Sequence, residues 1–201
     1  MIDPRVTLKV LTLSGLAAYA TFLPVRAQEV PPEASGGPEV LGDAEQLLNR
    51  LSTLTADDED EAGRLSREIQ ERWTHSGSVA MDLLLMRGKD AIEAGEYDRA
   101  VVHLTALTDH APGFAEGWNQ RATAFFMQDR LGEALSDIEQ ALILEPRHFG
   151  ALTGLGIILE QLGEPEAALR AFRAVQAIHP AEPQVNDAIE RLERQTGGRT
   201  L

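Results

Sequence analysis

Apolar residues recur at intervals of three and four positions along most of the chain from residue 43 onward, which is the period of an amphipathic helix. Residues 43–76 contain two such stripes. An acidic run from Asp57 to Glu61 separates them, where it suits a turn and places negative charge at the start of the second helix. The stripes are Leu47, Leu48, Leu51 and Leu54, and then Ala62, Leu65, Ile69 and Trp73. The pattern predicts a helical hairpin over residues 43–76.

The second half of the chain repeats itself with a period of 34 residues. Five columns of residue type stay in register across three copies. They are Leu84, Trp118 and Leu152; Gly88, Ala122 and Gly156; Ala100, Ala134 and Ala168; Leu104, Ile138 and Phe172; and Pro112, Pro146 and Pro180. Each copy predicts two amphipathic helices, 82–94 and 98–110 in the first. Small residues allow the two helices to approach closely, and the proline ends the second helix.

The best-preserved copy resembles the tetratricopeptide repeat. The signature of that family is an aromatic residue or leucine, a small residue four positions later, and then alanine, a large apolar residue and a closing proline. The matching residues here are Trp118, Ala122, Phe125, Ala134, Ile138, Ala141 and Pro146. Arg87 and Arg121 depart from the pattern, because leucine is usual at their position. The resemblance covers residues 81–182 and implies an all-α fold, a right-handed α-α superhelix of three helix pairs. The implied pairs are 81–114, 115–148 and 149–182.

Both ends of such an array need a covering element, because a single unit cannot bury its apolar face alone. Residues 183–196 supply one at the C-terminal end, where Pro183 suits the first turn of a helix. The apolar stripe of this capping helix consists of Val185, Ala188, Ile189 and Leu192. We expect the hairpin at 43–76 to cover the N-terminal end of the array, and residues 197–201 to form a short tail.

The N-terminal residues have the order of a secretory signal peptide. Arg5 and Lys9 precede an apolar stretch, Val10–Val25, that is shorter than the roughly 20 residues of a membrane span. Residues 1–27 are therefore predicted to be a cleaved signal peptide, and the expected location is the bacterial periplasm. The alternative is an uncleaved leader that anchors the protein in the inner membrane. Residues 28–42 are rich in proline and glycine and predict a flexible linker.

Composition excludes several function classes. The chain has 32 acidic and 18 basic residues, a net charge of -14, which argues against nucleic acid or an anionic lipid surface as the main partner. It has no cysteine, so it can form no disulfide, thiolate zinc site or cysteine nucleophile. Neither a Gly-x-Ser-x-Gly elbow nor a phosphate-binding loop is present. We therefore expect a protein that is not an enzyme and that has no cofactor or metal.

The five histidines show no close metal-ligand spacing. His110, His148 and His179 fall near the ends of the predicted second helices, where a cation interacts favourably with the helix dipole. We interpret these three histidines as helix caps.

The resemblance also implies a binding surface, because the first helix of each tetratricopeptide unit lines a concave groove that holds a peptide. The implied groove residues are Leu85, Lys89 and Ile92, then Asn119, Thr123 and Phe126, and then Thr153, Ile157 and Glu160. Phe126 is the candidate anchor for a peptide, with packing against a neighbouring helix as the alternative. Only Lys89 and Asn119 match the carboxylate clamp of one subclass of the family.

The sequence therefore predicts a non-catalytic scaffold or adaptor of the cell envelope that binds a protein or peptide partner in its groove. Two alternatives are a self-associating structural module and an assembly helper for exported proteins. A membrane contact is expected only if the leader stays uncleaved.

Overall fold

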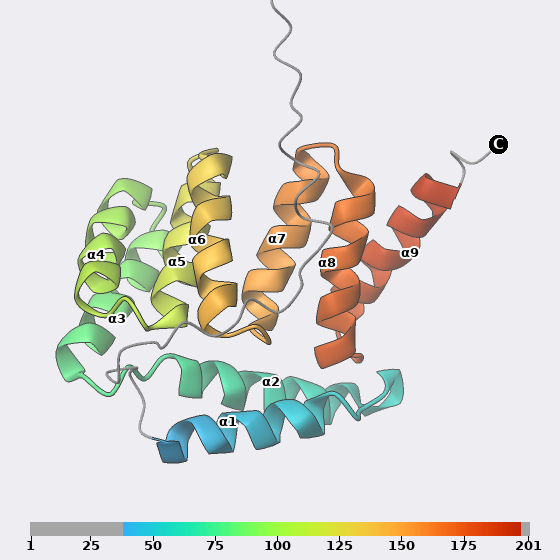
Figure 1. The fold of residues 1–201 in the computed structure, drawn as a ribbon, viewed down its shortest axis with the longest axis horizontal. Coiled ribbons are helices and arrows are strands. Elements are labelled where there is room, and N and C mark those ends of the chain that lie inside the picture. The colour runs from blue at the N-terminus through green and yellow to red at the C-terminus, as the bar shows by residue number, and fades with distance from the viewer. Residues whose placement is uncertain (1–37, 198–201) are drawn as a thin grey trace, which may run out of the picture. The chain divides into compact units, whose positions relative to one another are not determined.

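The structure, a computed structural model, describes residues 38–197, and every regular element in this range is a helix (Figure 1). The helices are α1 (Pro38–Leu51), the 3-10 turn η2 (Ala56–Asp58), α2 (Glu59–Trp73), α3 (Val79–Glu93), α4 (Tyr97–His110), α5 (Ala115–Met127), α6 (Leu131–Leu144), α7 (Phe149–Gln161), α8 (Pro165–Ile178) and α9 (Pro183–Gly197). The predicted leader at 1–27, linker residues 28–37 and tail residues 198–201 lie outside the described residues.

The helical hairpin begins earlier than expected. Helix α1 starts at Pro38, so residues 38–42 are helical and do not belong to a linker. Proline fixes φ near the helical value and has no N–H to satisfy, which makes it a suitable first residue of a helix. The composition of this segment predicted a linker because proline and glycine also dominate loops.

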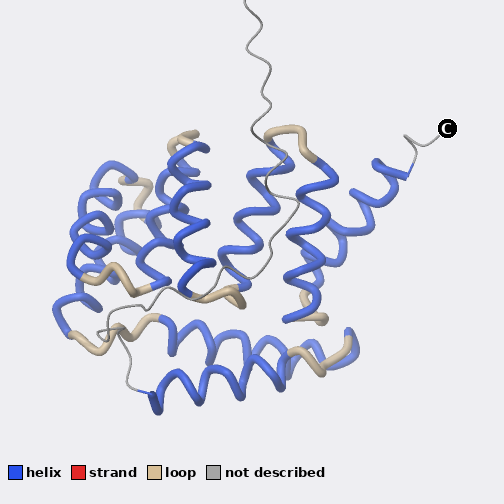
Figure 2. The backbone as a smooth tube through the Cα atoms, viewed as in Figure 1, coloured by secondary structure: helices blue, strands red, loops and turns tan. Residues whose placement is uncertain are grey.

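Three helix pairs, α3–α4, α5–α6 and α7–α8, follow the 34-residue period, and short loops join their members (Figure 2). The loops turn through left-handed residues at equivalent positions, Gly95 (φ 73°), Asp129 (φ 60°) and Gly163 (φ 77°). Close approach within a pair depends on the small column. A Cβ atom on Gly88 would lie 2.5 Å from Leu104, and one on Gly156 would lie 2.7 Å from Phe172. The expected roles of the two glycines are confirmed.

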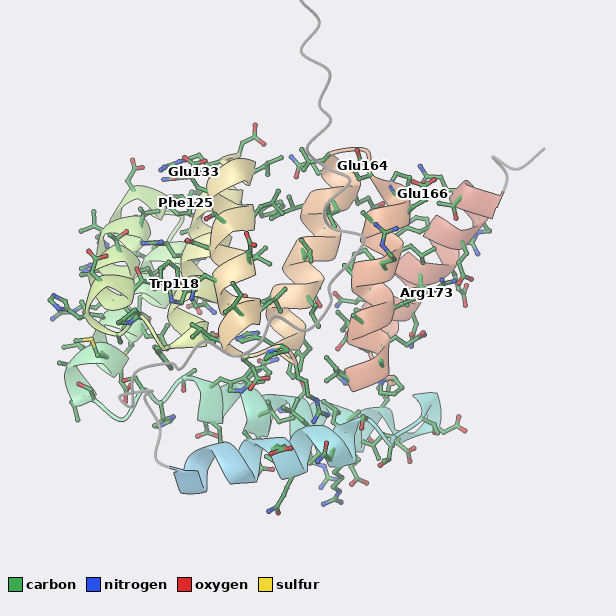
Figure 3. All side chains as sticks on the ribbon, viewed as in Figure 1. Trp118, Phe125, Glu133, Glu164, Glu166 and Arg173 are labelled. Atoms are coloured by element: carbon green, nitrogen blue, oxygen red, sulfur yellow. The ribbon has the colours of Figure 1, made fainter. Side chains whose placement is uncertain are left out.

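The C-terminal helix α9 covers the third pair as expected. Its apolar stripe of Val185, Ala188, Ile189 and Leu192 is buried in one core cluster with residues of α8. At the edge of this contact, Arg173 of α8 pairs with Glu193 of α9 at 2.6 Å (Figure 3).

The hairpin of α1 and α2 does not cover the N-terminal end of the array, and that expectation is wrong. Its buried residues, among them Leu51 and Ile69, share a core cluster with residues of α7, α8 and α9. The described residues of α3 and α4 pack in a different cluster. A hydrogen bond of 2.7 Å to the side-chain oxygen of Asn49 from Arg147, in the loop between α6 and α7, also ties α1 to the segment that leads into the third pair. The apolar stripes predicted which sides of the hairpin are buried, but they carried no information about the surface that buries them.

Candidate functional site

The predicted groove residues come from α3, α5 and α7, and most of them keep part of their surface accessible. Ile157 is the most exposed, at 43%. The half-buried residues are Lys89, Ile92, Asn119, Thr123, Phe126, Thr153 and Glu160. Leu85 differs, because only 2% of its surface is exposed and it packs in one core cluster with Ala124 of α5. Since a partner cannot reach Leu85, its assignment to the groove is wrong, and it is a core residue between the first two pairs.

Apolar side chains contribute one part of this surface. Ile92 and Phe126 each pack on a core cluster while keeping some accessible surface. Met127, next to Phe126, is exposed, as is Ile157 on the following pair. Phe126 therefore packs against its neighbours and keeps part of its surface accessible, and its role as an anchor for a peptide stays a prediction.

Most polar groups of the groove are already satisfied within the protein. The hydroxyls of Thr123 and Thr153 donate to the carbonyls four residues earlier, at 3.1 and 2.8 Å. Glu160 pairs with Arg191 of the capping helix. Asn119 donates to the Glu116 carboxylate at 3.0 Å. Among the described residues, Lys89 makes no ion pair, so its ammonium is the charge that this surface leaves available.

A buried polar cluster lies where α5 and α7 begin. His148 caps the N-terminus of α7, and its Nδ1 accepts a hydrogen bond of 3.2 Å from the Ala151 N–H. The proton of the neutral ring is then on Nε2, which donates to Glu116 at 3.0 Å. Trp73, the last residue of α2, stacks on the His148 ring with centroids 4.3 Å apart. Three separate helices thus meet at one histidine.

The electrostatics of this cluster centre on Glu116. Burial alone would raise the pKa of Glu116, but hydrogen bonds from His148, Gln120 and Asn119 together hold that pKa below its ordinary value. The carboxylate therefore stays ionised while it is almost completely buried.

The three histidines that we expected to cap the second helices differ from one another in the structure. His110 lies in the last turn of α4, as the sequence suggested, and is exposed. His148 is buried and caps the start of α7 through a ring nitrogen, so it is not a cation at the end of α6. His179 follows α8 and is also buried. It is the C-cap residue of α8, as expected, but burial lowers its pKa, against the opposing effect of Glu182, which disfavours a cation there.

Between residues 38 and 197, no three histidine, aspartate or glutamate side chains lie close enough to hold a metal ion. No helix in the same range is long and apolar enough to cross a membrane. An open pocket of about 740 Å³ is lined by residues 95–99, Gln128 and Arg130, and none of these is a predicted groove residue.

Comparison with known proteins establishes the family. The model of the tetratricopeptide repeat matches residues 85–143 and 130–183. A TPR repeat-containing protein of Rhizobium etli is 36% identical over 157 residues, which cover 78% of this chain and 76% of that protein. The chain belongs to the tetratricopeptide repeat (TPR) family. The resemblance found in the sequence and the all-α fold class are thus confirmed.

Solved structures of other proteins share this fold at low sequence identity. The first TPR domain of Spaghetti (RPAP3), solved with an HSP90 peptide, has a TM-score of 0.57 at 21% identity and covers 59% of this chain and 94% of that one. The type III secretion chaperone SycD of Yersinia enterocolitica, solved with a peptide of the translocator YopD, has a TM-score of 0.56 at 13% identity. That match covers 59% of this chain and 96% of SycD.

One departure from the TPR pattern has a structural explanation that the sequence did not reveal. Arg121, on the same helix as Trp118 and Phe125 (Figure 3), makes two hydrogen bonds to Asp137 of α6, at 2.7 and 2.8 Å. It also donates to the Thr108 hydroxyl at 2.8 Å. Arginine therefore replaces leucine here because it has a carboxylate partner inside the array. The signal available in the sequence was an aspartate 16 positions later on the next helix.

Proposed function

We propose that this protein is a non-catalytic adaptor that binds a segment of another protein in the groove of α3, α5 and α7. The observation that carries the proposal is the partial exposure of apolar groove residues, above all Phe126 and Ile157, on a TPR scaffold. TPR proteins generally act as non-catalytic scaffolds. Two structures of the same fold, RPAP3 and SycD, hold peptides of HSP90 and YopD respectively.

The charges of the groove favour a particular kind of segment. Glu116 and Glu160 are already paired with His148 and Arg191, so neither carboxylate is available to a cationic partner. Lys89 is unpaired among the described residues. A segment with an apolar side chain for Phe126 and a carboxylate for Lys89 therefore fits this surface, even though the chain as a whole carries a charge of -14.

Site-specific photo-crosslinking tests the groove directly. A photoreactive amino acid at Ile157 would lie on the proposed surface, and one at Ile143 of α6, which is 62% exposed, gives a matched control outside the predicted groove. We expect the photoreactive residue at position 157 to crosslink a specific protein in an extract of the cells that naturally produce this chain. The photoreactive residue at position 143 should not crosslink that protein. The capture should fall at least fivefold when Phe126→Ala and Lys89→Glu are combined. Equal capture at both positions, or no effect of the double substitution, contradicts groove binding.

The location is a separate part of the proposal. We propose that the protein works in the bacterial periplasm, and the support is the order of basic, apolar and small residues within residues 1–27. N-terminal sequencing of protein from the periplasmic fraction should begin near Gln28. A mature protein that begins at Met1 in the membrane fraction would instead support the uncleaved anchor.

A further inference from the structure

Helix α3 has an apolar side that no described element covers. Val79 is 87% exposed, Leu83 38% and Met86 52%. Their spacing of four and three residues places them on one side of the helix. The other side packs on α4, where Gly88 meets Leu104. We call Val79, Leu83 and Met86 the α3 stripe.

The repeat shows what normally lies on this side of a first helix. Leu83 corresponds to Gly117 in the second pair, where a Cβ atom would lie 3.1 Å from Leu107 of the preceding helix α4. In the third pair the same position is Ala151, which is completely buried. In both later pairs this position therefore faces the preceding unit. The α3 stripe presents the same surface without a preceding unit, because the hairpin packs on the third pair.

The opposite end of the array is polar and does not match the stripe. Helix α9 turns its apolar residues toward α8 and carries Glu190 and Arg194, which are exposed and pair with each other, on its outer side. Head-to-tail stacking would bury these charges against apolar side chains, which costs free energy. Two copies of the α3 stripe, in contrast, would bury apolar surface against apolar surface.

The charges around the stripe also suit a second copy. The chain carries -14, so two copies repel over most of their surface. On this side of α3 the exposed charged residues are Arg87, Asp90 and Glu93. In a two-fold contact the arginine of one copy offsets part of the acidic charge of the other.

We propose that the α3 stripe is a self-association surface, on which two copies pack α3 against α3 about a two-fold axis. Such a contact is isologous and closes on itself, so it yields a dimer and not a filament. The stripe has three apolar side chains, so we expect the dimer to be in equilibrium with the monomer at micromolar concentrations. The stripe does not include the predicted groove residues, and each dimer presents two grooves. The proposal therefore does not depend on groove binding.

The test uses the full chain and its lack of cysteine. Met86→Cys places a single thiol on the stripe, and Ile143→Cys places a single thiol on an exposed apolar position of α6. A flexible bismaleimide should link Met86→Cys into a dimer at least tenfold faster than Ile143→Cys. In sedimentation velocity, wild type should show a dimer fraction that rises with concentration. Met86→Glu should weaken this association at least tenfold, while Ile143→Glu leaves it unchanged, and circular dichroism should show equal helicity for all variants.

Three results would overturn the proposal. One is a wild-type protein that stays monomeric up to millimolar concentration. The second is equal behaviour of the variants at positions 86 and 143. The third is a monomer in which the Met86→Cys thiol is protected from a monofunctional maleimide, because residues 1–37 or another part of the same chain would then cover the stripe.

Discussion

Glu116 is a carboxylate in the first turn of α5 that stays charged while it is buried. Donors from His148, Asn119 and Gln120 surround its two oxygens. A buried charge is tolerated only when hydrogen bonds and an opposite dipole or charge replace water, and the start of a helix adds a favourable dipole. Because one of the donors is the N-cap of α7, this residue connects the second pair to the third.

The substitution Glu116→Gln tests this role. Because the pKa of Glu116 is lower in the folded protein than in the unfolded chain, its stabilisation is complete above the unfolded-state pKa, about 4.3, and is lost as pH falls through the folded-state pKa. We expect Glu116→Gln to lower the free energy of unfolding by about 1–3 kcal/mol at pH 7. The difference from wild type should shrink at pH 3, as measured by urea denaturation at both pH values.

The control for this prediction is Glu139→Gln, which changes an exposed carboxylate on α6 and should leave stability almost unchanged at both pH values. A difference that stays constant between pH 7 and pH 3 would contradict the assignment of the low pKa to Glu116.

At the scale of helices, the two halves of the described chain were predictable to different degrees. In the repeats each position has a counterpart 34 residues away, so the close-packing roles of Gly88 and Gly156 followed from the pattern. The hairpin has no such counterpart. Its stripes predicted two helices. One of its contacts, with the loop that leads into the third pair, joins residues 98 positions apart, Asn49 and Arg147, and such pairings leave no periodic signal.

The groove was predictable only as a set of positions. A helical register places Leu85, Thr123 and Phe126 on one side of their helices, but it does not say how deeply the next helix covers each of them. Leu85 is a core residue because α5 packs over it, whereas part of the surface of Phe126 stays accessible to solvent. The buried contacts of Glu116 with His148 and of Arg121 with Asp137 were missed because each joins two polar residues on different helices.

Trp73→Ala tests how the hairpin is attached. Trp73 contacts the rings of His148 and Phe149, at 4.3 and 5.0 Å between centroids, so its truncation removes the aromatic contact between α2 and α7. We expect a loss of about 2–4 kcal/mol in the stability of the docked hairpin. Hydrogen exchange should become faster in residues 44–73, while α3 and α4 keep their protection.

The matched control is Trp118→Ala, because Trp118 is also half-buried but belongs to the second pair and donates a hydrogen bond of 2.9 Å to the Pro112 carbonyl. Its truncation should speed up exchange in α5 and α6 and leave the hairpin protected. If exchange in residues 44–73 does not respond to Trp73→Ala, then the apolar contacts of α1 and α2 alone hold the hairpin in place.

For the molecule as a whole, the balance between apolar attraction and net charge decides how two copies meet. A dimer through the α3 stripe would hold two grooves on one particle. Two linked grooves bind a partner with two matching segments, or a partner that is itself oligomeric, more tightly than one groove does. The same dimer also brings together two chains of charge -14, so long-range repulsion opposes the apolar contact.

This opposition predicts the salt dependence of the dimer. Salt screens charges, so the range of the repulsion falls from about 30 Å at 0.01 M salt to about 3 Å at 1 M. Added salt does not weaken the stabilisation that comes from burying apolar surface. The dimer of the full chain should therefore become tighter, by about three- to tenfold, when sodium chloride rises from 0.05 to 0.5 M. Sedimentation velocity over a concentration series at each salt level measures the change. Association that instead weakens with salt would mean that ion pairs hold the two copies together, and Met86→Glu would then have little effect at low salt.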